Sequence, residues 1–192
     1  MNRQGTAEAV ALVAEALRVN ARYVEEVVIG WGLCPWAARA WTEGQVTQRV
    51  FTDAEPEVEP VAAFVDALVA RPDAAIGLAI FPRVACTLGA WERFAERVRR
   101  ARGAFLAAAF HPDYRPPDGP ALDPARLVPL IRRTPDPTLQ LVRASLIENL
   151  RGQVSNDVAR DNHTIVTARG PDALTALLDD IRRDRDASYG RG

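Results

Sequence analysis

Hydrophobic side chains recur at helical spacing through residues 7–28. An apolar stripe with this period predicts an amphipathic helix whose apolar face packs against a core. Gly30 and Gly32 end this predicted helix, and Pro35 begins a second one that runs to about Thr42. Proline suits the first helical position because the N–H that it lacks would have no partner there. The first part of the chain is therefore expected to form two helices separated by a short turn.

Three segments farther along have the character of strands. Residues 46–51 alternate between apolar and polar side chains, whereas 74–81 and 104–110 are short apolar runs typical of buried strands. Helices are predicted between these strands, at 56–70 and 87–102. Strands that alternate with helices of this length are typical of a parallel sheet covered by helices.

The remaining residues are expected to be mostly helical. Residues 115–122 contain three prolines and one glycine, which predicts a loop. A short helix at 124–131 and a longer one at 137–151 follow, each begun by a proline. A last strand at 164–168 and a helix at 171–183 complete the prediction.

The order of these elements defines the expected fold. The sequence shows no internal repeat and no linker that would separate two domains. We therefore expect a single α/β domain over residues 1–192, a layered fold with a mostly parallel central sheet of about four strands flanked by helices.

Charge and hydropathy narrow the expected environment and partners. The formal net charge is −1, so no excess of positive charge attracts nucleic acid or an anionic membrane surface. No apolar run reaches the roughly 18 residues that a membrane-spanning helix needs. The first residues do not form the apolar core of a signal peptide. We expect a cytoplasmic protein that binds neither nucleic acid nor membrane, and the sequence leaves homo-oligomerisation open.

Residue counts exclude several kinds of chemistry. All 24 basic residues are arginine, which excludes lysine Schiff bases, anchoring of pyridoxal phosphate and the lysine-containing phosphate-binding loop. Cys34 and Cys86 are the 2 cysteines, and His111 and His163 are the 2 histidines. Their number and spacing do not fit a structural zinc site, and in a reducing cytoplasm both thiols should be free.

The segment Gly30–Trp36 carries the strongest chemical candidate, a cysteine directly before the proline that is expected to start a helix. At the N-cap, the Cys34 sulfur would face unpaired backbone N–H groups and the positive end of the helix dipole, which favour the thiolate. A thiolate can attack an electrophile or ligate a metal. Alternatively, Cys34 is a small core side chain buried between Trp31 and Trp36.

Further candidates follow the predicted strand at 104–110. His111, Asp113 and Tyr114 lie beyond its carboxyl end, where open α/β sheets usually bind their ligands. His111 could serve as a base or a metal ligand, and Tyr114 could donate a hydrogen bond. The alternative is a loop histidine that binds local backbone, next to a tyrosine that only packs.

Arginines gather around a segment stiffened by two prolines, residues 132–137. Arg132, Arg133 and, farther on, Arg143 suit a carboxylate or a phosphate, and Glu148 lies on the same predicted helix as Arg143. The alternative is a set of solvated ion pairs with the acidic residues nearby.

Three separated motifs in the same order resemble a single family. They are Val27–Ala37 with the helix before it, Phe110–Tyr114, and Arg133–Ser145. From about residue 8 to residue 152, the chain resembles the bacterial family called domain of unknown function 1415. The resemblance implies a shared site and names no reaction.

The resemblance also selects residues of this chain as site candidates. Those that match the family's pattern are Cys34, Pro35, His111, Pro112, Arg133, Pro135, Arg143 and Glu148. The chain departs from the pattern at two positions: Phe81 precedes Pro82 after the middle strand, and Gln140 is present, where relatives have histidines. Of a multi-histidine metal site, only His111 would remain here.

Three functions are consistent with these residues. The first is a redox enzyme that modifies a small molecule, with a haem or an open-site metal such as iron ligated by Cys34 or His111 and arginines binding anionic groups. The second is a cofactor-free enzyme in which Cys34 is the nucleophile, His111 the base and the arginines a clamp for a small anionic molecule. The third is a non-catalytic domain that binds a ligand or a partner.

The predicted site residues fall into three groups. The catalytic candidates are Cys34, His111, Tyr114 and Glu148. The cofactor-binding candidates are Cys34, Trp36, His111, Arg132, Arg133 and Arg143, and the metal candidates are Cys34 and His111.

Overall fold

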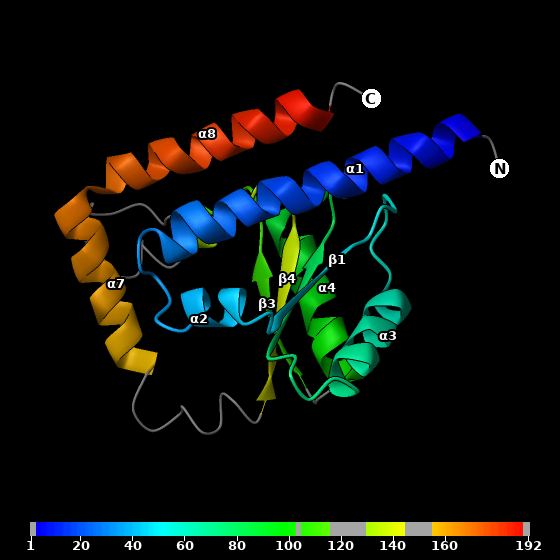
Figure 1. Cartoon of the computed structure of the whole chain (residues 1–192), viewed down its shortest axis with the longest axis horizontal. Helices are drawn as coiled ribbons and strands as arrows, with labels where there is room; N and C mark the ends of the chain where they lie inside the picture. Colours follow the sequence, from blue (N-terminus) through cyan, green and yellow to red (C-terminus); the bar gives the residue numbers. More distant parts are fainter. Residues whose placement is uncertain (1–2, 103–104, 116–129, 145–154, 190–192) are drawn as a thin grey trace.

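A four-stranded sheet lies at the centre of the protein (Figure 1). The computed structural model describes residues 3–102, 105–115, 130–144 and 155–189. The strands β1 (Val46–Val50), β2 (Ile76–Ile80), β3 (Phe105–Phe110) and β4 (Thr138–Arg143) lie in the order β1-β2-β4-β3. β1 and β2 are parallel, whereas β4 is antiparallel to both of its neighbours. The α/β prediction is confirmed, but the sheet is mixed and mostly antiparallel.

The prediction of a mostly parallel sheet is wrong because of one segment. Residues 138–143, expected in a helix at 137–151, form β4 and separate β2 from β3. β2 and β3 both run opposite to β4, so they run in the same direction as each other and as β1. Within β4, Leu139 and Leu141 are fully buried on one face. Pairing with two strands and burial of these leucines outweigh the helix-start signal of Pro137.

The helices described before β4 follow their predicted segments closely, whereas most of the helix predicted at 124–131 lies outside the described residues. α1 (Arg3–Arg22) continues directly as a π-helix, η1 (Tyr23–Ile29), and a short α2 (Ala37–Thr42) follows. α3 (Val58–Val69) connects β1 to β2, and α4 (Leu88–Ala101) connects β2 to β3.

Apart from Gly170, the described residues after residue 154 are helical. They form α7 (Ser155–Arg169) and α8 (Pro171–Tyr189). The strand expected at 164–168 lies within α7, so that prediction is wrong. Val166 is fully buried there against Leu174 and Leu178 of α8, and this packing overrides the strand preference of a β-branched run. No helix within the described ranges is both long and apolar enough to cross a membrane.

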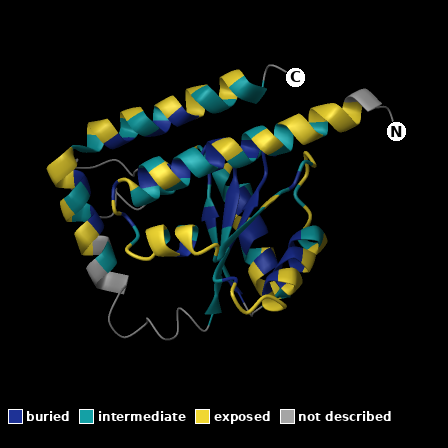
Figure 2. Ribbon diagram, viewed as in Figure 1, coloured by how far each residue is buried: buried dark blue, intermediate teal, exposed yellow. Residues whose placement is uncertain are grey.

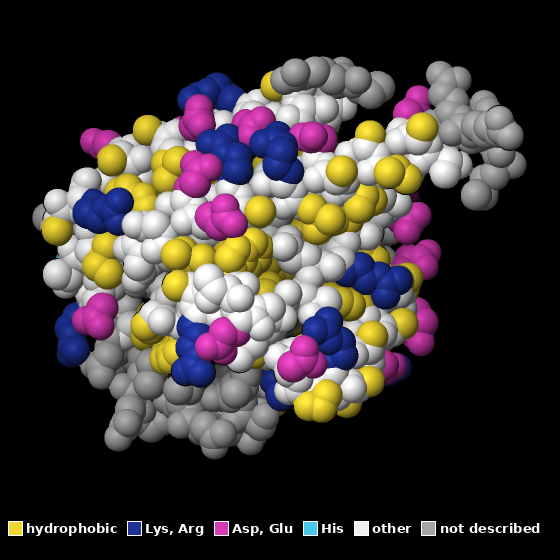
Figure 3. All heavy atoms as spheres, viewed as in Figure 1, with side chains coloured by type: hydrophobic (Ala, Val, Ile, Leu, Met, Phe, Trp, Pro, Cys, Tyr) yellow, Lys and Arg dark blue, Asp and Glu magenta, His cyan; other side chains and the backbone are white. Residues whose placement is uncertain are grey.

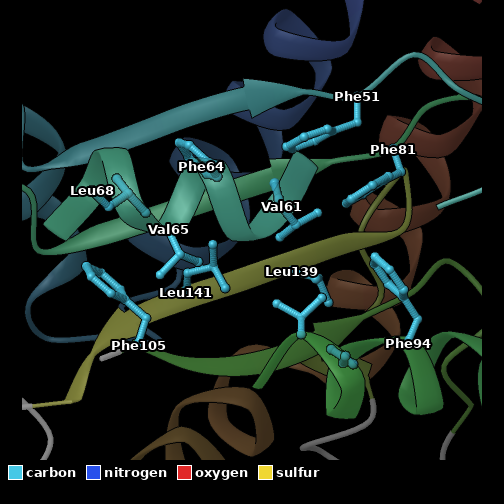
Figure 4. Packing of buried hydrophobic residues seen from close by; sticks show 14 of the residues in the cluster. Phe51, Val61, Phe64, Val65, Leu68, Phe81, Phe94, Phe105, Leu139 and Leu141 are labelled. Atoms are coloured by element: carbon cyan, nitrogen blue, oxygen red, sulfur yellow. The ribbon is translucent and has the colours of Figure 1, made fainter. Parts of the chain in front are cut away.

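The helices cover the two faces of the sheet differently. α3 and α4 lie against one face, while α1 crosses the other with α8 running alongside it (Figures 1 and 2). Under α3 and α4, the rings of Phe51 and Phe81 stack at 4.9 Å (Figure 4). Trp91 meets Phe81 edge-on at 5.1 Å. Aromatic rings bury large apolar areas, so we expect this face to supply much of the stability.

Ion pairs hold α8 against the rest of the second layer. Asp184 accepts hydrogen bonds from Arg18 at 2.8 Å and from Arg22 at 2.7 Å, which joins α8 to α1. The fully buried Asp136, just before β4, accepts from Arg185 at 2.8 Å and from the hydroxyl of Tyr189. These contacts fix α8 beside the start of β4.

Candidate functional site

A cavity of about 300 Å³ lies between the sheet and the helices of the second face. Most of its wall is apolar, formed by Tyr23, Val24, Val28, Leu33, Ala37, Trp41, Val46, Ile76, Leu78, Phe110, Ile131 and Val158. Its polar residues come from distant parts of the chain and are Asn20, Cys34, Arg132, Thr134, Thr138, Gln140 and Asn162. Hydrophobic side chains also gather on the surface between α1 and α2 (Figure 3). Apolar walls with a few converging polar groups are typical of small-molecule sites.

The strands supply the floor of this cavity through the alternation of their side chains. Leu78 of β2 is paired with Gln140 of β4, and Val46 of β1 with Ile76 of β2. Paired residues point to the same face of a sheet, and successive residues point to opposite faces. Gln140 therefore faces the cavity. Its two neighbours in β4, Leu139 and Leu141, point to the other face and pack in the aromatic core.

The π-helix η1 supplies one wall. Gly30 N–H donates to the carbonyl of Glu25 at 2.8 Å, a separation of five residues that widens the helix at this point. Tyr23, Val24 and Val28 of η1 line the cavity, and the Tyr23 hydroxyl donates to the carbonyl of Ile131, which also lines it. Burial raises the pKa of Tyr23, so the hydroxyl stays a donor. π-helical turns are rare and frequently occur at functional sites.

Arg132 is the one charged side chain among the described residues that line the cavity, and no described Asp or Glu lines it. The guanidinium carbon lies 6.0 Å from the centre of the Phe110 ring. The neighbouring Arg133 instead donates to Asp179 of α8 at 2.8 Å. Of the two adjacent arginines, one therefore faces the cavity and the other is part of an ion pair.

Asn20 was not among the predicted site residues. Its side chain lines the cavity and is 1 % exposed, and its Oδ1 atom has no hydrogen-bond partner among the described residues. Buried polar atoms in folded proteins nearly always have a partner. The sequence does contain a signal, because Asn20 interrupts the apolar stripe between Leu17 and Val24.

Cys34 lines the cavity and is half-buried, but its backbone does not have the predicted role. The N-cap of α2 is Trp36, and the helix begins at Ala37, whose N–H donates to the Cys34 carbonyl at 3.1 Å. The N-cap prediction is wrong, so the argument for a thiolate stabilised by a helix end does not apply. Trp36 is 42 % exposed and does not line the cavity.

His111 is not among the described residues that line the cavity. It is 3 % exposed, and its Nδ1 atom accepts a hydrogen bond from the Asp113 N–H at 3.1 Å. Burial lowers its pKa, against the opposing effects of Asp113 and a hydrogen bond with the Cys86 backbone. His111 is therefore expected to be neutral and to hold the turn after β3, and the structure does not bring it to the cavity wall that carries Cys34.

Tyr114 also lies away from the cavity lining. Its hydroxyl donates to Glu92 of α4 at 2.9 Å. Burial and the Glu92 carboxylate raise the pKa of Tyr114, and the Arg132 guanidinium opposes this shift. This tyrosine joins the turn after β3 to α4.

Arg143 lies on the opposite face of the sheet. Its guanidinium donates to the carbonyls of Leu68 at 2.9 Å, Arg71 at 2.8 Å and Ala74 at 3.1 Å. These carbonyls belong to the end of α3 and the turn after it, so Arg143 holds that helix end in place. The structure does not bring it together with Arg132. Glu148 lies outside the described residues.

The described residues do not form a set of ligands for the predicted metal. Within the described part of the chain, no group of three or more His, Cys, Asp or Glu side chains is placed to hold a metal ion. A haem or a metal ligated by Cys34 or His111 stays a prediction from the sequence.

Comparison with known proteins identifies a family. The model of the family described as "Protein of unknown function (DUF1415)" matches residues 15–176. Every described residue that lines the cavity lies within the matched range. No curated protein and no solved structure matches the chain.

Proposed function

The chain belongs to the DUF1415 family, as its three motifs predict, and we propose that it binds a small, largely apolar carboxylate in the cavity between η1 and the sheet. The observation that carries the proposal is the character of the wall. Among the described lining residues, Arg132 is charged, none is acidic, and most of the others are apolar.

Elementary electrostatics favours an anion in such a place. A charge in surroundings of low dielectric constant attracts an opposite charge more strongly than it would in water. The planar guanidinium of Arg132 can donate two parallel hydrogen bonds to one carboxylate. The apolar part of the ligand would cover Val24, Leu33 and Trp41, at about 25 cal/mol for each Å² of apolar surface removed from water. The volume, about 300 Å³, is at the lower end for ligand sites and fits a compact molecule.

Calorimetric titration with naphthoate and with the uncharged naphthamide tests this proposal. We expect naphthoate to bind the native protein roughly tenfold or more tightly than naphthamide, because a charge-assisted pair contributes about 1.5–3 kcal/mol. Arg132→Gln should remove this difference. Arg133→Gln is the matched control and should keep it, because Arg133 pairs with Asp179 outside the cavity. Equal affinities for the two compounds, or equal losses in the two variants, would refute the proposal.

A second candidate, a cofactor-free enzyme with Cys34 as the nucleophile, is favoured by one observation. Cys34 and Arg132 line the same cavity, so an anion bound at Arg132 lies in the space onto which the thiol opens. The test uses a Cys86→Ser background, in which Cys34 is the remaining thiol. Naphthoate should slow the alkylation of Cys34 by iodoacetamide; an unchanged rate would separate Cys34 from the ligand site and remove this candidate.

A further inference from the structure

Asn20 occupies a position where an apolar side chain would be more stable. The residue lies on the buried face of α1 with its Oδ1 atom unpartnered, next to apolar side chains of η1. An unsatisfied buried polar atom destabilises the folded protein, whereas a buried leucine would stabilise it. A polar residue kept at such a cost, with its side chain on a cavity wall, points to a partner that enters the cavity.

The hydrogen-bonding character of Asn20 and Arg132 separates their roles. A guanidinium can only donate hydrogen bonds, so it suits the carboxylate oxygens of a ligand. Asn20 Oδ1 can only accept, and an ionised carboxylate can only accept as well. The carboxylate that Arg132 binds therefore cannot satisfy Asn20 Oδ1. With the amide in this orientation, a second group on the ligand is needed to supply an O–H or N–H to Oδ1.

We propose that Asn20 is a specificity-determining residue that accepts a hydrogen bond from the ligand, and that the ligand class is an apolar carboxylate carrying a hydroxyl or N–H group. This inference rests on the proposed function, because it assumes that Arg132 binds the carboxylate in the same cavity. It goes beyond that proposal by assigning a second polar contact to the ligand and a residue that reads it.

The binding test compares naphthoate with its hydroxy-substituted isomers, which place the donor at different positions. In the native protein, at least one isomer should bind about five- to tenfold more tightly than naphthoate, the gain expected for one buried hydrogen bond of about 1–1.5 kcal/mol. In Asn20→Leu, the ratio of the two affinities should fall to about one, whatever the affinity for naphthoate itself. If naphthoate itself does not bind, the proposed function fails. If naphthoate binds and no isomer gains, or if the gain survives in Asn20→Leu, the inference about Asn20 fails alone.

Thermal unfolding of the ligand-free protein gives an independent readout. Asn20→Leu should raise the unfolding midpoint, because it replaces an unsatisfied buried amide with an apolar side chain. Gln48 of β1 is the matched control. Its Oε1 atom is also buried without a described partner, and its pairing with Leu78 places it on the face of the sheet that borders the cavity. Gln48 itself does not line the cavity. Gln48→Leu should leave the preference for the hydroxy-substituted isomer intact. A lower midpoint for Asn20→Leu would show that Asn20 serves the fold and would overturn the inference.

Discussion

The two faces of the sheet are built from alternate residues of the same strands, yet one is filled and the other is not. Beneath α3 and α4, Phe51, Phe64 and Phe81 pack ring against ring (Figure 4). A Cβ atom added to Gly77 on this face would lie 2.4 Å from Leu68 Cδ1. The face toward α1 and η1 instead leaves a cavity of about 300 Å³ with polar groups on its wall. One face is suited to stability, and the other has room for a ligand.

The largest expected difference between the faces is the cost of removing one leucine. Leu139 of β4 is fully buried in the aromatic core, and Leu139→Ala should lower the free energy of unfolding by about 3–4 kcal/mol. Leu78 of β2 borders the existing cavity, so Leu78→Ala should cost about 1–2 kcal/mol less. Urea unfolding measures both. Equal losses would mean that the two faces are packed alike.

Replacing a small residue with a larger one should also cost more stability on the packed face than beside the cavity. Gly77→Ala forces a methyl group against Leu68 and the Phe64 ring, and should cost about 1–3 kcal/mol. Ala37→Leu places its extra atoms in the cavity, so it should cost little stability while blocking naphthoate binding. Ala38→Leu, at the exposed neighbouring position of α2, is the control and should leave binding unchanged. Naphthoate binding that survives Ala37→Leu would place the ligand elsewhere.

A smaller effect, confined to a pH range, is expected from His111. Burial lowers its pKa below the ordinary value of 6.5, so the unfolded chain takes up the proton more readily than the folded protein. The contribution of neutral His111 to the free energy of unfolding should be fully present above pH 6.5. It should be lost as the pH falls from 6.5 toward the lowered pKa of the folded protein. Unfolding free energies at about pH 7.5 and about pH 5.5 should differ less in His111→Asn than in the native protein. An identical difference would contradict the assignment of a buried, neutral histidine.

The same variant also bears on the site. His111 is absent from the described cavity lining, so His111→Asn should leave the affinity for naphthoate unchanged at about pH 7.5. A large loss of affinity would instead support the sequence-based pairing of His111 with the Cys34 site.

The smallest effect is expected where an arginine is partly exposed. Arg133 and Asp179 form an ion pair with side chains that are 20 % and 45 % exposed. Pairs of this kind contribute about 0.2–1 kcal/mol, so Arg133→Gln should change the unfolding free energy by less than about 1 kcal/mol. A larger loss in urea unfolding would show that this pair is essential to the docking of α8.

Much of the fold could be predicted from local patterns. The strands β1, β2 and β3 and the helices α3 and α4 lie within two residues of their predicted ends. β4 could not be predicted in this way, because proline precedes strands as well as helices and because its partners, β2 and β3, are distant in sequence. Its insertion between them changes the sheet from parallel to mixed.

The candidate site was predicted only in part for a related reason. Cys34 and Arg132 were predicted as site residues from their side-chain chemistry, and both line the cavity. Arg143 was assigned to the same arginine clamp because residues 137–151 were expected to be helical. In a strand, side chains alternate between the two faces, so Arg143 lies on the face opposite Gln140. Asn20 was missed because a single polar residue in an amphipathic helix is usually solvated. Only the packed structure shows that it is buried.

The most direct test of the central claim, that one face binds and the other only stabilises, follows the indole N–H signals of the tryptophans. Trp41 lines the cavity, Trp91 is fully buried in the aromatic core, and Trp36 is exposed. In a ¹⁵N-labelled protein titrated with naphthoate, the Trp41 signal should shift progressively and saturate, while those of Trp91 and Trp36 stay in place. A Trp91 shift as large as that of Trp41, or no shift of Trp41 at saturating naphthoate, would contradict the account.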